Sequence, residues 1–121
     1  MKSSGWKYKR EDDALKYLIV CDGGNVRSAA LATTLKLDYG QEAIAVGRLY
    51  MSSETMVMLS NWADRIILMQ AHMIESIPDF NQNKCGVADV GQDRWGIYIH
   101  PELNELVNNI AAELEKEKVH G

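Results

Sequence analysis

The sequence has few of the residues that mark a disulfide-stabilised or metal-binding protein. Its 121 residues include only two cysteines, Cys21 and Cys85, and three histidines. Two cysteines, in a chain whose first residues do not have the form of a signal peptide, argue against a disulfide scaffold. The histidines are scattered without the spacing of a zinc site, so we expect no bound metal and no cofactor.

Positive charge and long apolar runs are also scarce. The chain has 13 lysines and arginines against 17 acidic residues, a net charge of -4. A protein that binds nucleic acid through its phosphate backbone is expected to carry a basic face, so we expect no nucleic-acid partner. No apolar run approaches the ~20 residues that span a bilayer. We therefore expect a cytoplasmic protein without a membrane partner; the sequence does not indicate its oligomeric state.

The remaining composition is typical of one globular domain. Hydrophobic residues make up 46% and charged residues 25% of the chain, which is too apolar for a disordered protein. A chain of this length leaves little room for a second domain. Residues 1–14 are polar, mixed in charge and without periodicity, so we interpret them as a loose N-terminal arm. Residues 15–121 are interpreted as a single domain.

Short apolar runs alternate with segments of helical periodicity along this domain. The expected strands are 16–21, 43–46, 65–70 and 85–90, and the expected helices are 28–39, 52–62, a short piece at 71–77, and 101–118. Continuously apolar strands separated by helices are typical of a parallel sheet that is covered on both faces. The sequence therefore predicts a three-layer α/β fold.

The first loop of this predicted fold has the clearest chemical signature. In an open parallel sheet, ligands bind beyond the carboxyl ends of the strands, where loops enter helices. Such a loop joins the first expected strand to the first expected helix. Two glycines in it permit tight curvature, and its amide groups can converge on a phosphate at the helix amino terminus. Its residues are Cys21, Asp22, Gly23, Gly24, Asn25, Val26, Arg27 and Ser28.

The same surroundings predict roles for three side chains of the loop. A thiol at a helix amino terminus near an arginine favours the thiolate form, so Cys21 is expected to be a nucleophile. The planar guanidinium of Arg27 can bind two phosphate oxygens at once. Ser28 can donate a hydrogen bond to the sulfur. The alternative for this pattern is a buried cysteine at a strand end beside a surface arginine.

Residues 21–28, near the amino end of a small α/β domain, resemble the active-site loop of the low-molecular-weight protein tyrosine phosphatases. The resemblance implies a flavodoxin-like, four-stranded parallel sheet with helices on both faces. It also implies metal-free hydrolysis of phosphotyrosine, in a phosphorylated protein or as a small aryl phosphate, through a phosphocysteine. In that reaction Cys21 is the nucleophile, Arg27 the phosphate clamp and Ser28 the hydroxyl that supports the thiolate.

Three residues of the loop depart from the family pattern. Gly24 stands where asparagine is usual, and Asn25 follows it. Val26 replaces a frequent second cysteine, so no disulfide can form within the loop. Asp22 places a carboxylate beside the nucleophile, where it would repel a phosphate dianion unless it points away. A non-catalytic module that binds phosphate or a phosphopeptide is therefore one alternative function.

The resemblance also implies a general acid, an aspartate in a late loop before the last helix. Asp93 is the first candidate, because it lies in a predicted loop and Trp95 follows two residues later. Asp89 is the second candidate and lies in the expected fourth strand, and Asp79 is the third. For each of them, a turn or helix-cap role is the more common one for an isolated aspartate.

A thiol redox enzyme similar to the arsenate reductases is a further alternative. It needs a second cysteine that forms an exchangeable disulfide with Cys21. The sequence offers only Cys85, which we expect to be a buried and inert thiol. Outside the loop, Arg48, Tyr50 and Trp95 can line a pocket for a phenyl ring, although surface or core positions are more common for such residues.

Overall fold

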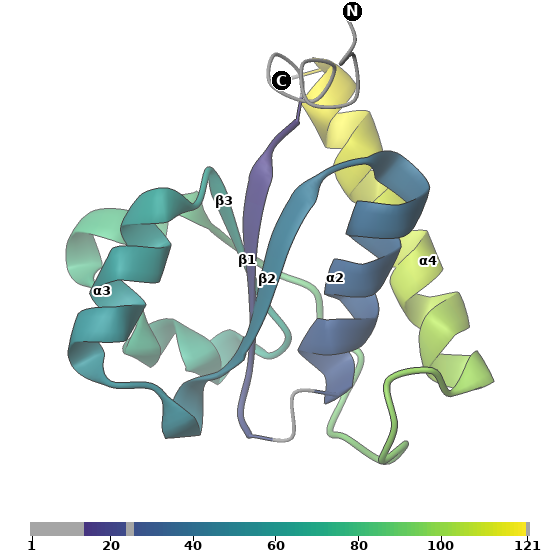
Figure 1. Cartoon of the computed structure of the whole chain (residues 1–121), viewed down its shortest axis with the longest axis horizontal. Helices are drawn as coiled ribbons and strands as arrows, with labels where there is room; N and C mark the ends of the chain where they lie inside the picture. Colours follow the sequence, from purple (N-terminus) through teal and green to yellow (C-terminus); the bar gives the residue numbers. More distant parts are fainter. Residues whose placement is uncertain (1–13, 24–25, 121) are drawn as a thin grey trace, which may run out of the picture.

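A four-stranded parallel sheet organises the chain (Figure 1). The structure is a computed structural model that describes residues 14–23 and 26–120, with side chains described as far as residue 117. The strands are β1 (Lys16–Cys21), β2 (Glu42–Gly47), β3 (Arg65–Leu68) and β4 (Cys85–Val87), in the spatial order β2-β1-β3-β4. Most of the expected N-terminal arm, residues 1–13, lies outside the described residues.

Helices cover both faces of the sheet. Figure 1 shows α2 (Val26–Tyr39) and α4 (Pro101–His120) on one side and α3 (Ser53–Trp62) on the other. Three 3-10 helices complete the described elements: η1 (Arg48–Tyr50), η2 (Ala71–Ser76) and η3 (Asp79–Lys84). The predicted three-layer, flavodoxin-like α/β fold is thereby confirmed.

Strand β1 lies at the centre of the sheet because it is apolar on both faces. Residues Tyr17 to Cys21 are at most 1% exposed. Burial of such a run requires a helix layer on each side and a neighbouring strand along each edge. In the register, Cys21 lies opposite Gly47 of β2, and Val20 lies opposite Leu68 of β3. The carboxyl ends of the three strands therefore reach the same edge of the sheet, where their loops can meet.

The helix boundaries follow from capping residues. The Ser52 side chain accepts a hydrogen bond from the Thr55 amide and caps α3. Helix α2 ends before Gly40, whose φ of 67° is in the left-handed region that favours glycine. Pro101 begins α4, and a stripe of buried side chains on this helix faces the core. That stripe consists of Leu103, Val107, Ala111 and Leu114.

Element limits in the second half of the chain differ from the expected ones. Strand β4 ends at Val87 instead of residue 90, so Asp89 lies in a loop and not in a strand. The reason is pairing: β4 is an edge strand, and its only neighbour, β3, ends at Leu68. The expected short helix at 71–77 is a 3-10 helix, and Pro78 separates it from a second one that the sequence pattern did not indicate.

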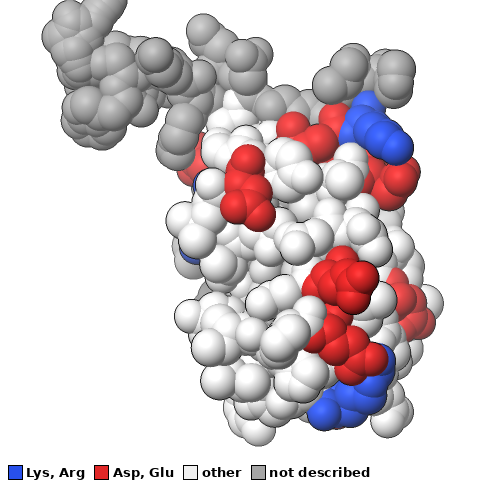
Figure 2. Space-filling model, turned by 90° about the vertical axis from the view of Figure 1, so that its right-hand side faces the viewer, with Lys and Arg blue, Asp and Glu red and all other residues white. Residues whose placement is uncertain are grey.

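Two surface properties bear on the partners of the protein. Figure 2 shows mainly acidic side chains on the face formed by α2 and α4, so this face does not offer the basic surface that a phosphate backbone requires. Among the described residues, none of the helices combines the length and the apolar character needed to cross a membrane.

Gly47 brings the end of β2 into close contact with the loop after β1. A Cβ atom at residue 47 would lie 2.8 Å from the carbonyl oxygen of Gly23 and 3.2 Å from its carbonyl carbon. These atoms belong to the backbone, so they cannot move aside by rotation of a side chain. Only glycine at residue 47 permits this approach between β2 and the loop.

We expect Gly47→Ala to lower the free energy of unfolding by about 1–3 kcal/mol, because the added methyl group forces the two backbones apart. Urea unfolding measures this change. Gly86→Ala in β4 is the matched control, since a Cβ atom there meets no atom within 4 Å. Its expected effect is within about 0.5 kcal/mol. If both variants lost the same free energy of unfolding, the contact with Gly23 would not be the reason that residue 47 must be glycine.

Candidate active site

Cys21 and Ser28 lie together where β1 ends and α2 begins. The Cys21 Sγ atom is 3.1 Å from the Ser28 Oγ atom, and both residues are buried. At this distance the hydroxyl can donate a hydrogen bond to a thiolate. The sulfur therefore faces the first turn of α2, whose amide groups lack acceptors within the helix and favour a bound anion.

Arg27 is buried and bridges the loops that follow β3 and β4. Its Nη1 atom donates to Gln70 Oε1 at 2.7 Å and to the carbonyl oxygen of Gly91 at 2.8 Å, and the residue is only 5% exposed. The other edge of the guanidinium carries Nε and Nη2. That edge of the guanidinium is the one that offers two parallel N–H groups to a phosphate.

The remaining residues of the predicted loop are described only in part. Gly24 and Asn25 lie outside the described residues, so the full ring of amide groups is not observed. Gly23 lies against the ring of Tyr50, and Val26 is the first residue of α2. In the described part of the chain, no three His, Cys, Asp or Glu side chains are grouped so that they could hold a metal ion.

The carboxylate of Asp22 contacts residues of η1 and η2. Its Oδ1 atom accepts a hydrogen bond from Arg48 Nε at 2.7 Å, and both oxygens lie 3.3 Å from His72 Nε2. The hydrogen bond from Arg48 lowers the pKa of Asp22, burial opposes this effect, and the contact with His72 lowers the pKa further. Asp22 thus faces η1 and η2, whereas its neighbour Cys21 contacts α2.

The two leading candidates for the general acid lie in one loop. Asp89 Oδ1 accepts from the Gly91 amide at 2.7 Å, and Asp93 Oδ1 accepts from the amides of Trp95 and Gly96 at 3.0 and 3.2 Å. Each carboxylate therefore stabilises a turn. Gly91 lies between them in the sequence, and its carbonyl group binds Arg27. The loop that carries both aspartates is therefore anchored to the buried guanidinium.

Asp79, the third candidate, has a different environment. It begins η3 and forms a 3.4 Å hydrogen bond with Gln82 of the same 3-10 helix. This helix is attached to α3, because Asn81 donates to the Ser60 hydroxyl and to the Asn61 side chain. The structure therefore groups Asp79 with α3 and not with the loop that binds Arg27.

The three expected pocket walls have different surroundings. Tyr50 is 81% exposed and its ring lies beside Gly23, so it can contact a group bound at the loop. Trp95 is buried in the hydrophobic core; its indole N–H donates to Glu102 at 2.9 Å, and the guanidinium of Arg94 lies over its ring. Arg48 is held by Asp22. Trp95 thus has the core position that is the more common one for such a residue.

Gln70 and Gly91 are site residues that the sequence analysis missed. The signal available for Gln70 was its position directly after a buried strand, at the edge where ligands bind in parallel sheets. Gly91 contributes a backbone carbonyl, which no side-chain pattern indicates. Their separations from Arg27 are 43 and 64 residues, so only the folded chain brings them together.

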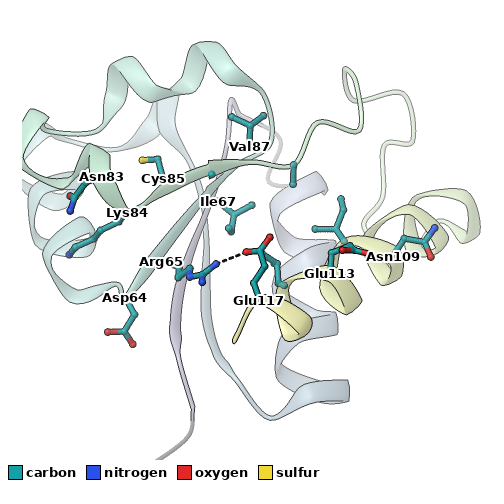
Figure 3. Close-up of a pocket in the computed structure, with 14 residues that line it drawn as sticks. Asp64, Arg65, Ile67, Asn83, Lys84, Cys85, Val87, Asn109, Glu113 and Glu117 are labelled. Carbon is teal, nitrogen blue, oxygen red and sulfur yellow. Dashed lines mark hydrogen bonds and ion pairs between the residues drawn. The ribbon is translucent and has the colours of Figure 1, made fainter. Parts of the chain in front are cut away.

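Cys85 lies in a separate groove of about 730 Å³ between β4 and α4, which the Arg65–Glu117 ion pair also lines (Figure 3). Burial raises the pKa of the Cys85 thiol. In the register, Cys85 of β4 lies opposite Ile66 of β3, and Ile66 lies opposite Leu18 of β1. Cys85 is therefore two strands away from β1, and Leu18 is three residues before Cys21 along that strand. With ~4.8 Å between strands and ~3.3 Å per residue, the two cysteine Cα atoms are about 14 Å apart. A disulfide requires less than ~7 Å.

Comparison with known proteins identifies the fold. No protein-family model matches the sequence, and no curated protein sequence matches it. Among solved structures, the chain is similar to the YwlE arginine phosphatase from Geobacillus stearothermophilus, with a TM-score of 0.60 and 18% sequence identity. The alignment covers 88% of this chain and 96% of the arginine phosphatase. This chain has the same fold.

Gln70→Leu removes one of the two acceptors that hold Arg27 while keeping a side chain of similar size. We expect vanadate, an oxyanion shaped like phosphate, to bind about tenfold more weakly, because a hydrogen bond to a charged group contributes roughly 1.5 kcal/mol or more. Isothermal titration calorimetry measures the affinity. Gln82→Leu is the control, since its amide bonds the Ile77 carbonyl next to η3. Equal weakening in both variants would argue against a role for Gln70.

Proposed function

We propose that this protein is a metal-free, cysteine-dependent phosphatase with Cys21 as its nucleophile. The observation that carries the proposal is the placement of the Cys21 sulfur against the Ser28 hydroxyl, with the buried Arg27 in the same first turn of α2. Attack on a phosphate group requires a sulfur nucleophile and a fixed cation that can bind the phosphate oxygens, and both are present at the start of α2. The fold shared with an arginine phosphatase supports the same class of reaction.

The proposed substrate is phosphotyrosine in a protein, or a small aryl phosphate. The resemblance of residues 21–28 to the loop of the low-molecular-weight tyrosine phosphatases supports this choice. The exposed ring of Tyr50 beside Gly23 supports it as well, because an aromatic wall can contact a phenyl ring. Phosphoarginine is the second candidate substrate, and the arginine phosphatase of the same fold is the observation that favours it.

In the first step, Cys21 Sγ attacks phosphorus, an S–P bond forms and the bond from phosphorus to the leaving oxygen breaks. The Nε and Nη2 groups of Arg27 and the loop amides stabilise the three equatorial oxygens. Ser28 supports the sulfur, and Asp93 gives its proton to the leaving oxygen. In the second step, Asp93 takes a proton from water, the water oxygen attacks phosphorus, and the S–P bond breaks. Cys21 returns as thiolate and phosphate is released.

Asp93 is the proposed general acid, and Asp89 is the alternative. Both lie in the loop that Arg27 binds through Gly91, and both use Oδ1 for the backbone hydrogen bonds described. In either residue, Oδ2 is the atom left to carry the transferred proton. Asp93 is preferred because it lies farther along the loop from β4, where a larger movement toward the substrate is possible.

The two other functional hypotheses have less support. A redox cycle through a Cys21–Cys85 disulfide conflicts with the separation of the two residues in the sheet register. A module that binds phosphate without turnover drew its support from the carboxylate of Asp22. The pairing of this carboxylate with Arg48 weakens that support, because the cation offsets its charge.

Cys21→Ser is expected to lower kcat for para-nitrophenyl phosphate by at least ~10³-fold, because a serine hydroxyl is a far weaker nucleophile than a thiolate. Release of nitrophenolate measures the rate. Cys85→Ser, a change at the remote groove, is the control and should retain activity. Undiminished turnover in Cys21→Ser would overturn the assignment. Affinity of the unmodified protein for a phosphotyrosine peptide without hydrolysis would favour the binding module.

Asp93→Asn tests the general acid while keeping the oxygen that accepts the Trp95 and Gly96 amides. We expect kcat to fall ~10²–10⁴-fold for aryl phosphates with basic leaving groups, and less for acidic ones that need no proton. The matched variant Asp89→Asn, in the same loop, is expected to change kcat little. The opposite pattern would assign the acid to Asp89, and no dependence on the leaving group in either variant would exclude both.

A further inference from the structure

A cluster of charged residues surrounds Asp22, the residue that follows Cys21. Arg48 connects the cluster: its Nε atom donates to Asp22, and its Nη1 atom donates to Glu75 Oε2 at 3.0 Å and to Ser76 Oγ at 2.9 Å. The Arg48 side chain is only 13% exposed, whereas those of Asp22 and Glu75 are 31% and 68% exposed. A single, partly buried guanidinium thus joins the residue after β1 to η2.

The position of Asp22 is fixed through its backbone as well. Its carbonyl oxygen accepts a 2.9 Å hydrogen bond from the Leu49 amide, the residue after Arg48. His72 Nε2 lies 3.3 Å from the carboxylate on the side of η2. The charged and titratable groups that face Asp22 are therefore Arg48 and His72, with Glu75 behind Arg48. These contacts direct the carboxylate toward η1 and η2, whereas the Cys21 sulfur contacts Ser28 of α2.

We propose that Arg48 is a positioning residue for the Cys21 site, which holds the Asp22 carboxylate away from the nucleophile and offsets its charge. This inference rests on the proposed function. A carboxylate one residue from a thiolate disfavours the ionised sulfur and repels a phosphate dianion. With His72 neutral, the two carboxylates and Arg48 carry a net charge of -1, and loss of Arg48 changes this to -2 beside the site.

Two further observations support the role of Arg48. The hydrogen bond with Asp22 raises the pKa of Arg48 and lowers the pKa of Asp22, so each charge stabilises the other. The contacts with Asp22, Glu75 and Ser76 also require donors that diverge from one planar group. Arginine has this geometry, and the single ammonium group of lysine does not.

A double-mutant cycle with Arg48→Met and Asp22→Asn tests the proposal on aryl phosphate hydrolysis. We expect Arg48→Met to lower kcat/KM about tenfold, the effect of one uncompensated charge a few ångströms from a charged group in a partly solvated site. The loss should include a higher KM, and the acid limb of the pH–rate profile should move to higher pH. The double variant should recover most of the lost kcat/KM, because the charge that Arg48 offsets is then absent.

A titration that needs no turnover separates this inference from the proposed function. In a Cys85→Ser background, the ultraviolet absorbance of the thiolate reports Cys21 alone, since the chain has two cysteines. We expect Arg48→Met to move thiolate formation to higher pH and the added Asp22→Asn to reverse the shift. If the unmodified protein hydrolyses no phosphate ester, the proposed function fails, and this titration still decides the charge effect of Arg48.

The result that would overturn the proposal is equal impairment of Arg48→Met and the double variant, because Arg48 would then act only as a structural link. Thermal unfolding monitors whether the variants fold. If Arg48→Met does not fold, Arg48→Lys replaces it, since lysine keeps the charge and loses the divergent contacts. Asp22→Asn should then improve the kcat/KM of Arg48→Lys, and failure to do so would equally reject the role.

Discussion

The buried charge of Arg27 imposes the main constraint on the site. A guanidinium withdrawn from water is strongly unfavourable unless acceptors surround it. Gln70 and the Gly91 carbonyl meet this need, and they come from the loops after β3 and β4. The same two bonds therefore fix the start of α2 against two neighbouring loops. Both of these bonds use Nη1, and the edge that carries Nε and Nη2 is the one whose geometry suits an oxyanion.

Two neighbouring residues that would otherwise interfere contact different parts of the fold. Cys21, the last residue of β1, contacts Ser28 of α2, and Asp22, which follows the strand, contacts Arg48 of η1 and His72 of η2. A carboxylate that follows a nucleophilic sulfur in the sequence is unfavourable unless a cation beside the carboxylate offsets its charge. In the proposed arrangement, Arg48 is that cation.

The parts of the molecule that could be predicted from sequence depend on local patterns. The apolar run of β1, the Ser52 cap and the Gly40 stop each act within a few residues, and the fold followed from them. The loop at residues 21–28 was found for the same reason. Pairings across the fold were not predictable: Arg48 is 26 residues from Asp22. Likewise, β4 ends where its neighbour β3 ends, and the partner of the buried Trp95 N–H group, Glu102, is seven residues away.

The distance between the two cysteines has a consequence for oxidative stress. Val26 occupies the loop position where a second thiol could stand, and the sheet register keeps Cys85 far from Cys21. A Cys21 sulfenic acid formed by peroxide would thus have no neighbouring thiol with which to condense. It would persist until an external thiol such as glutathione reduced it, or it would advance to the sulfinic acid, which is not readily reversed. The placement of two sulfur atoms thereby leaves recovery from oxidation to the surrounding thiol pool.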